Sequence, residues 1–283
     1  MPELPDLEYI VEHLRPALKG ESIGEVKVKQ PIVIRNLAGG SFEETLMGRE
    51  VLEIVRTGPF VDFQLNGDLH LVMHAMLAGR FALDPKVKKT GLCFTLKTEQ
   101  ALLTFLDTKK MAKVYLAFKK DLGKIPRFLE QGPNILDEAF TREVFEKIMG
   151  KNRKQVRVFI MDQTKLSAVG NAYADEILFE AGIHPKTTCN QLDQGEREKL
   201  FLAVKGVMAW GIDQVRAAGR PIEEKVREHV RVRNRKDEPC PRCETRIRRA
   251  SVLGHDAFFC PTCQPPKRGQ FIDWSTVKKK DNA

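Results

Sequence analysis

The first two residues after the initiator methionine carry groups that could do covalent chemistry. Met before Pro is normally removed, which would leave Pro2 with a free secondary amine. Such an amine is a nucleophile near neutral pH, because α-amino groups titrate near ~8 and lysine only near ~10.4. Attack on a sugar C1′ would expel a base and leave an iminium, and Glu3 could protonate the opening sugar as a general acid. The alternative is that Glu3 simply suits the dipole of a helix N-terminus.

Four of the six cysteines occur in two pairs with the spacing of a metal site. Cys240 and Cys243 form one C-x-x-C pair, and Cys260 and Cys263 form a second pair after sixteen intervening residues. Each pair can present two sulfurs to one tetrahedral ion, whereas two disulfides are the alternative. The first ten residues carry acids where a signal peptide carries bases, so we expect a reducing, cytoplasmic and nucleoid-associated location. We therefore predict one Zn²⁺, structural because four thiolates leave no open coordination position.

The net positive charge arises entirely from the second part of the chain. Residues 1–150 hold 21 basic and 21 acidic side chains, whereas residues 151–283 hold 26 and 17. Such a one-sided excess is typical of proteins that bind a polyanion such as nucleic acid, although a generic solvated basic surface is the alternative. No run of about 18 apolar residues occurs, so we expect no membrane span.

A β-rich region must position the N-terminal residues. Residues 5–18 are apolar every three or four positions, which predicts an amphipathic helix that stops at Gly20. Short alternating or β-branched runs follow at 24–36, 51–65, 69–76, 79–83, 92–98, 101–106 and 112–118. Asn66-Gly67 between two of these runs predicts a hairpin turn. The fold class is therefore α+β, with a β-sandwich over 1–130 and the first helix packed on it.

The second part of the chain has helical periodicity. Apolar residues recur every three or four positions in runs at 141–150, 153–161, 171–182 and 194–218. Residues 221–236 are polar and charged, and we expect them to form a mobile loop. We predict a helical domain over 131–236, a zinc-ribbon hairpin over 237–272 and a flexible tail over 273–283.

Three motifs occur in an order that is typical of one family. Pro-Glu-Leu-Pro stands at 2–5, MDQTKLSAVGNAYADEILFEAGIHP at 161–185, and the four-cysteine ribbon follows. Together they resemble the formamidopyrimidine-DNA glycosylase / endonuclease VIII family from end to end. The segment 161–185 is similar to the helix–two-turn–helix segment of that family and is the most specific match. The resemblance implies a catalytic β-sandwich, a helix–two-turn–helix DNA-binding domain and a DNA cleft between the two.

The resemblance also implies roles for individual residues. Base excision by the Pro2 amine would be followed by strand cleavage, which makes the chain a DNA glycosylase and AP lyase. Glu3 would be the acid/base, and Glu8 matches an acid near the lesion pocket. Lys165 and Asn171 match contacts to the DNA backbone, although Asn171 could instead be a local helix cap. The partner would be double-stranded DNA with a damaged base or an abasic site, bound by a monomer.

Two basic positions of the family pattern are missing. Where the family carries a lysine after its third strand, this chain has Pro59, which offers neither charge nor donor. Where the family carries an arginine in the zinc hairpin, this chain has His255, which is mostly neutral at pH 7 and lacks the bidentate fork. Arg248 or Arg249 could compensate. We expect His255 to be a partial DNA-binding replacement.

The residues that would fill the gap left by an extruded base also differ from the family. His74 to Gly79 resembles the loop that carries the plug, which makes Leu77 the first candidate and Met76 the second. In the segment 107–112, Lys109 could replace the family's wedge arginine, Lys110 could contact a phosphate, and Met111 could stand for a phenylalanine. The alternative is that Met76 and Leu77 are core residues.

These features support two functions of different classes. The first is an active glycosylase whose lesion preference has shifted from the usual oxidised purines. Its activity is favoured by the presence of Pro2, Glu3, Lys165, Asn171 and the four zinc cysteines. The second is a DNA-structure or abasic-site binding protein of the same fold with little or no base excision, as Pro59 and His255 indicate. The lesion itself does not follow from the sequence.

Overall fold

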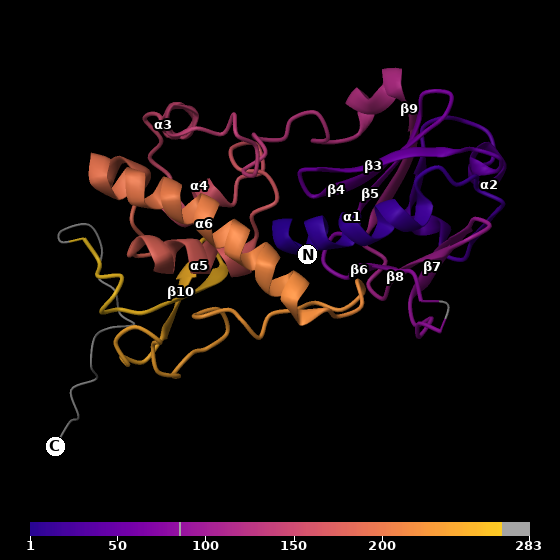
Figure 1. Cartoon of the computed structure of the whole chain (residues 1–283). Helices are drawn as coiled ribbons and strands as arrows, with labels where there is room; N and C mark the ends of the chain where they lie inside the picture. Colours follow the sequence, from indigo (N-terminus) through magenta and orange to yellow (C-terminus); the bar gives the residue numbers. More distant parts are fainter. Residues whose placement is uncertain (85, 268–283) are drawn as a thin grey trace. The chain divides into compact units, whose positions relative to one another are not determined.

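The computed structural model describes residues 1–84 and 86–267, and the chain forms two compact units (Figure 1). The first unit contains residues 1–131 together with 211–226, and the second contains 132–210 together with the described residues from 227 onward. Within the described residues, no helix combines the length and the apolar character that a membrane crossing requires. The tail predicted over 273–283 lies outside the described residues.

Two β-sheets and one long helix make up most of the first unit. The first sheet is antiparallel and has the strand order β1 (Glu25–Val28), β7 (Leu92–Lys97), β8 (Leu102–Asp107) and β6 (Gly79–Ala82). The second has the order β2 (Ile34–Asn36), β9 (Lys113–Phe118), β5 (Leu69–His74), β4 (Phe60–Leu65) and β3 (Val51–Thr57), antiparallel except between β2 and β9. The predicted β-sandwich is confirmed.

Helix α1 (Leu4–Leu18) begins two residues after Pro2 and packs against β3. Its apolar positions fall on one face, as the periodicity predicted, and their side chains are almost fully buried: Leu7, Ile10, Val11, Leu14 and Leu18. Burying an aliphatic side chain contributes roughly 1.5–3 kcal/mol relative to leaving it exposed. The helix therefore fixes the start of the chain firmly on the sandwich.

Two interruptions of the predicted strands and one short helix were not predicted from the sequence. The run over 24–36 is interrupted by the 3₁₀ turn Pro31–Val33, because a proline nitrogen cannot donate to a strand neighbour. The run over 51–65 is two strands joined at Gly58, whose φ of +57° favours glycine. The short helix α2 (Phe42–Leu46) was missed; Ser41 caps it by accepting from the Glu44 N–H at 3.3 Å.

The second unit contains the predicted helices and the hairpin. The helices are α3 (Arg142–Met149), α4 (Val156–Ile160), α5 (Asn171–Ala181) and α6 (Gln194–Ala218), and the hairpin strands are β10 (Arg248–Val252) and β11 (His255–Phe259). The 3₁₀ turn Cys189–Gln191 also lies in this unit, whereas the 3₁₀ turn Lys119–Lys124 lies in the first unit. The helix α6 continues beyond this unit, because its residues from Gly211 onward belong to the first unit.

The segment after α6 is irregular but anchored. Charged residues dominate its sequence, yet the side chains of Ile222, Val226, Val230 and Val232 are at most 8% exposed. Residues up to Val226 pack with the first unit, although the sequence predicted one helical domain over 131–236. The segment is an irregular loop, as expected, and these four buried apolar side chains anchor it in the fold.

Candidate functional site

A small recess in the first unit encloses the start of the chain. Its volume is about 70 Å³, and Pro2 and Asp6 line it from the N-terminal side. The loop before β6 contributes Leu77 and β6 contributes Arg80, while residues 222–225 form a further wall. Segments that are distant in the sequence thus meet around Pro2.

Two hydrogen bonds hold Met1 in this recess. The Met1 ammonium donates to the Leu77 carbonyl at 3.3 Å, and the Lys225 ammonium donates to the Met1 carbonyl at 3.1 Å. The sequence drew attention to Leu77 but not to Lys225, because nothing in the local pattern links residue 225 to the N-terminus. This contact depends on the tertiary fold, which brings residue 225 back to the N-terminus.

Glu3 lies directly behind Pro2 at the N-cap of α1. It is only 4% exposed, and its backbone N–H donates to Asp6 Oδ2 at 2.7 Å in a capping box. The helix dipole favours a carboxylate at this position. The structure therefore supports the capping role and, at the same time, places the carboxyl group next to Pro2 in the chain.

Glu8 has a basic partner that the sequence did not reveal. Its carboxylate forms a hydrogen-bonded ion pair with Arg56, whose side chain is 3% exposed. Arg56 also donates to the Gly58 carbonyl at 3.2 Å. The pair therefore joins α1 to the turn between β3 and β4. The carboxylate keeps 23% of its side-chain surface exposed.

The loop between β5 and β6 displays Leu77. Met76 adopts a φ of +49°, and Gly79 N–H donates to the Ala75 carbonyl at 2.7 Å, which closes a tight turn. A Cβ on Gly79 would come within 2.4 Å of that carbonyl oxygen, so the turn requires glycine. Leu77 is 58% exposed and Met76 is half-buried. Leu77 is thus not a core residue.

A partly buried histidine sets the conformation of the same loop. His74 Nδ1 accepts from the Met76 N–H at 2.9 Å, and the ring packs edge-on against Phe60. Burial lowers the pKa of His74 to about 4, and the nearby N-terminal ammonium acts in the same direction. The neutral ring that this pKa implies is the form that can accept the hydrogen bond.

The segment between β8 and β9 is built around one carboxylate. Asp107 is fully buried and accepts from the backbone N–H groups of Lys109 at 2.9 Å and of Met111 at 2.7 Å. The buried carboxylate binds the backbone of this segment, and the side chains of Lys109, Lys110 and Met111 are exposed. These three predicted residues are therefore available to a ligand.

The two departures from the family pattern occupy different environments. Pro59 is buried in the turn between β3 and β4. His255 is exposed at the start of β11, where it pairs with Val252 across the hairpin. Arg249 forms an ion pair with Asp256 at 3.4 Å, and Arg248 one with Asp237 at 3.9 Å. Both arginines suggested as replacements thus already have acidic neighbours.

A buried polar cluster links Asn171 to the zinc hairpin. Arg157 is 1% exposed and donates to Asn171 Oδ1 at 2.9 Å, to Asp175 Oδ1 at 2.8 Å and to the Asp256 carbonyl at 2.9 Å. Arg233 donates to Asp175 Oδ2 and to the same carbonyl, both at 2.8 Å. Asn171 at the first turn of α5 is therefore fixed relative to the residue that follows His255. The sequence did not identify this cluster.

The turn that carries Lys165 is fixed by a glutamine. Gln163 Oε1 accepts from the Ala168 N–H at 2.7 Å, and its amide donates to the Val169 carbonyl at 2.9 Å. Ala168 adopts a φ of +61°, which these bonds hold in place. Lys165 itself is partly exposed. The turn thus presents a lysine a few residues before the start of α5.

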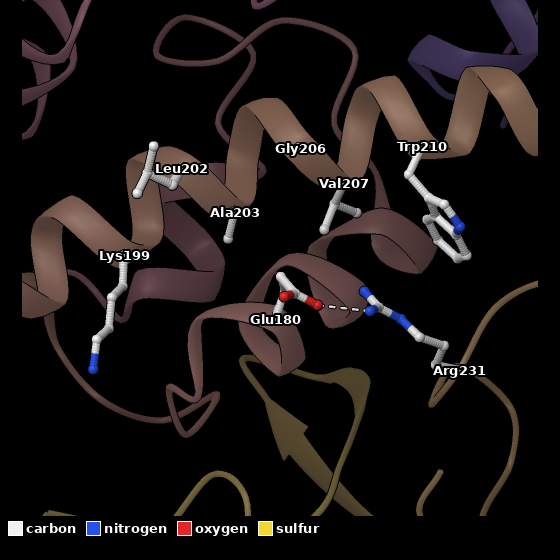
Figure 2. Close-up of a pocket in the computed structure, with 8 residues that line it drawn as sticks. All are labelled: Glu180, Lys199, Leu202, Ala203, Gly206, Val207, Trp210 and Arg231. Carbon is white, nitrogen blue, oxygen red and sulfur yellow. Dashed lines mark hydrogen bonds and ion pairs between the residues drawn. The ribbon is translucent and has the colours of Figure 1, made fainter. Parts of the chain in front are cut away.

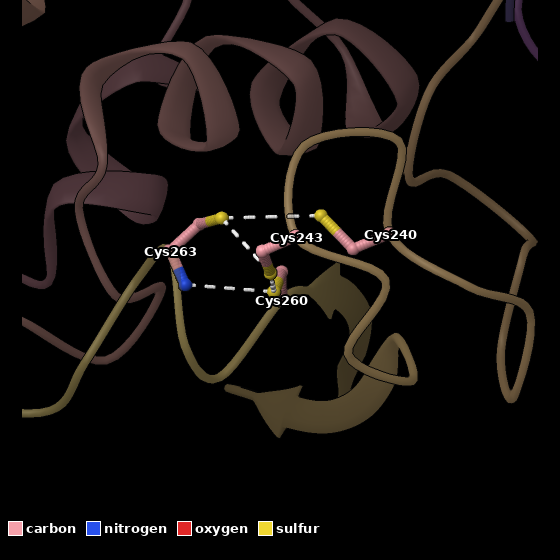
Figure 3. Close-up of side chains that lie close together, drawn as sticks. All are labelled: Cys240, Cys243, Cys260 and Cys263. Atoms are coloured by element: carbon pink, nitrogen blue, oxygen red, sulfur yellow. Dashed lines mark hydrogen bonds between the residues drawn. The ribbon is translucent and has the colours of Figure 1, made fainter.

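The four paired cysteines converge on one point (Figure 3). Their sulfurs all lie within 4.8 Å of one another, with separations of 3.9 Å between Cys240 and Cys263 and 3.4 Å between Cys243 and Cys260. Four thiolates at ~2.3 Å from a tetrahedral zinc would be about 3.8 Å apart. None of the four forms a disulfide. The donor set fits one structural Zn²⁺, as predicted.

A second hollow, of about 430 Å³, lies in the second unit along α6 (Figure 2). Leu202, Val207 and Trp210 line it, and Arg231 reaches it from the returning segment, paired with Glu180 at 2.6 Å. The Arg231 guanidinium stacks over the Trp210 ring at 4.8 Å. None of the predicted catalytic or DNA-binding residues lines this hollow.

Comparison with known proteins identifies relatives of the whole chain. Residues 1–114 match the formamidopyrimidine-DNA glycosylase N-terminal domain, 131–219 the H2TH domain of the same proteins, and 237–266 the zinc finger found in FPG and IleRS. The formamidopyrimidine-DNA glycosylase of Pelotomaculum thermopropionicum is 30% identical over 277 residues, which cover 94% of this chain and 100% of that protein.

Solved structures agree with this result. The MutM (FPG) protein of Thermus thermophilus superposes with a TM-score of 0.81 at 28% identity, covering 93% of this chain and 98% of that one. The Fpg of Lactococcus lactis in a complex with abasic-site DNA gives a TM-score of 0.84 at 25% identity, covering 93% and 100%.

Proposed function

Because the chain belongs to the formamidopyrimidine-DNA glycosylase family, we propose that it excises damaged bases from double-stranded DNA and then cleaves the abasic strand. The observation that carries the proposal is the position of Pro2 in a recess, between the exposed Leu77 loop and the segment 222–225. An amine in such a recess can meet a sugar carbon, while the neighbouring loop is free to enter the DNA.

The chemistry would begin at the Pro2 nitrogen once Met1 has been removed. Its lone pair attacks C1′ and the base departs. The C1′–O4′ bond then breaks, O4′ takes up a proton, and the nitrogen lone pair forms the C=N bond of a Schiff base between Pro2 and C1′. Glu3 follows Pro2 directly in the chain and would transfer protons to and from the sugar. Loss of a C2′ proton from the Schiff base then expels the 3′ phosphate, which cleaves the strand.

DNA binding would use residues that are exposed or partly exposed. Lys165 and Asn171 stand at the turn before α5 and at the start of that helix, where they can donate to phosphate oxygens. Lys109 and Lys110 are displayed beside Met111. Leu77 is the best candidate to fill the gap in the base stack, because it is an apolar side chain exposed on a rigid turn.

We further propose that lesion preference has shifted from the usual oxidised purines. The buried Pro59 provides no charge at the position of the family lysine, and exposed His255 provides only a partial one. Losing one charge-assisted hydrogen bond typically costs about 1.5–3 kcal/mol. Abasic sites and loosely paired lesions need less energy to extrude, so weaker binding to the DNA backbone suffices for them.

The test is borohydride trapping on a duplex with one abasic site. The processed protein should form a covalent adduct whose peptide map places the DNA on Pro2. A chain that retains Met1, or a Pro2→Gly variant acetylated at its amine, should form none. An undiminished adduct in a blocked chain would mean that another amine is the nucleophile.

The same assay distinguishes the second candidate function. A protein that binds abasic or distorted DNA without excision would retard the duplex in a gel but give no adduct and no cleaved strand. Pro59 is the observation that favours this alternative. Removal of 8-oxoguanine as fast as cleavage at an abasic site would instead contradict the proposed shift in preference.

A further inference from the structure

We propose that Lys225 is a further catalytic residue of the Pro2 centre, and that it protonates the oxygen on the sugar C1′ as the Schiff base forms. The inference rests on the proposed function, because it requires the Pro2 amine to be the nucleophile. It adds a residue from the segment after α6, which no motif in the sequence marked as catalytic.

The Met1–Pro2 peptide bond imitates the intermediate. In the chain that still carries Met1, the carbonyl carbon of Met1 is bonded to the Pro2 nitrogen in a planar, partly double bond. The sugar C1′ would occupy the same position after attack by that nitrogen. The Met1 carbonyl oxygen therefore stands in for an oxygen attached to C1′, and it is the atom to which Lys225 Nζ donates at 3.1 Å.

The same contact places Lys225 close to the nucleophile. A peptide oxygen lies about 2.3 Å from the nitrogen of the next residue, so Lys225 Nζ is within about 5.4 Å of the Pro2 nitrogen. Other charged groups line the recess: Asp6 from α1, Arg80 from β6, and Glu223 and Glu224 from the segment of Lys225. Among these groups, Lys225 has a geometry that fits a proton donor, because its ammonium donates to the stand-in oxygen.

Schiff-base formation would need only Pro2, Lys225, the abasic sugar and water. The Pro2 nitrogen adds to the C1′ aldehyde of an abasic sugar, and its proton passes to the oxygen to give a carbinolamine. Lys225 then transfers one proton to the carbinolamine hydroxyl. The C1′–O bond breaks, its electron pair leaves with water, and the nitrogen lone pair forms the C=N bond. Solvent water reprotonates the neutral Lys225 amine.

The experiment measures the rate of borohydride trapping on abasic-site DNA with the processed enzyme in excess. Lys225→Met should slow trapping by at least about tenfold, since a positioned general acid contributes about 10²–10⁴-fold. Lys97→Met removes an equal charge from the exposed end of β7 and is the matched control. Lys97→Met should trap the DNA at the wild-type rate.

A pH profile separates a catalytic role from a structural one. The wild-type rate should decline at alkaline pH, where the ammonium loses its proton, and Lys225→Met should lack that decline. Lys225→Arg should recover part of the rate and move the decline upward, because a guanidinium holds its proton to higher pH. A slow variant with an unchanged alkaline decline would overturn the inference.

The inference and the proposed function fail in different ways. If Lys225→Met traps DNA at the wild-type rate while a blocked Pro2 amine abolishes trapping, Lys225 has no catalytic role and the proposed function stands. If blocking Pro2 has no effect, the proposed function fails first. A peptide map that then places the adduct on Lys225 would identify it as the nucleophile and overturn its role as an acid.

Discussion

At the scale of single residues, His255 is the substitution whose effect can be isolated. It is exposed on β11, whereas Pro59 is buried in a turn that a lysine would disturb. Removing this exposed imidazole in His255→Ala should therefore weaken binding to an abasic duplex, as measured by fluorescence anisotropy.

An arginine at this position should restore a permanent charge. His255→Arg is expected to steepen the dependence of log affinity on log salt by about one unit. His13→Gln, on the exposed side of α1, is the control for the loss of an exposed imidazole elsewhere in the chain. Equal losses of affinity in the His13 and His255 variants would show that the effect is not specific to His255.

The pair of Arg56 and Glu8 leads to a second prediction. Arg56→Met should lower the free energy of unfolding by about 1–3 kcal/mol, because it leaves a largely buried carboxylate without its cation. Adding Glu8→Gln to that variant should recover part of the loss, and urea denaturation of the two single variants and the double variant measures the coupling. Additive losses would mean that the two side chains do not depend on each other.

At the scale of elements, the loop that carries Leu77 should be sensitive to acid. The pKa of His74 is about 4 in the folded chain, below its ordinary 6.5, because the ring is buried. Its contribution to stability is complete above pH 6.5 and is lost as the pH falls toward 4, since protonation is easier in the unfolded chain. The loss should approach about 3 kcal/mol at most.

Thermal unfolding between pH ~7.5 and ~4.5 measures this loss. His74→Asn keeps an acceptor for the Met76 N–H but does not titrate in this range, so its melting temperature should change less with pH. His13→Gln again provides the comparison, because His13 is exposed. Parallel curves for wild type and His74→Asn would contradict the assignment.

Elements also show what the sequence can and cannot predict. The helix over 194–218 followed from apolar spacing alone, because helical periodicity is a local property of the chain. The split of 51–65 into two strands depended on one glycine with a positive φ, and the alternation on either side masked it. Sequence motifs identified the four cysteines of the metal site and also singled out Pro2, which lines the recess. Lys225, Arg56 and Arg157 were missed because their partners are 224, 48 and 14 to 99 residues away in the chain.

At the scale of the whole molecule, zinc and DNA binding should depend on each other. The zinc hairpin shares the Arg157 and Asp175 cluster with α4 and α5, so loss of the metal should disturb Asn171 and His255 together. Metal analysis should give one zinc per chain. Cys263→Ser should weaken DNA binding by at least about tenfold and leave the first unit folded.

Near-ultraviolet circular dichroism and limited proteolysis report on the two units in that variant. Cys189→Ser is the control, because Cys189 is buried outside the four-sulfur cluster. Normal DNA binding by a zinc-free protein would rule out the structural role of the metal.

The return of α6 to the first unit has a consequence for the order of events on the ribosome. Residues 222–225 complete the recess around the chain start, and they are synthesised after about four-fifths of the chain. At about 5–20 residues per second, the nascent N-terminus waits roughly ten seconds or more for that wall. An aminopeptidase can reach Met1 during this interval, before Leu77 and Lys225 hold it. Because residues 222–225 are synthesised late, Met1 can be removed before the recess is complete. The folded protein then encloses the Pro2 amine that this removal has exposed.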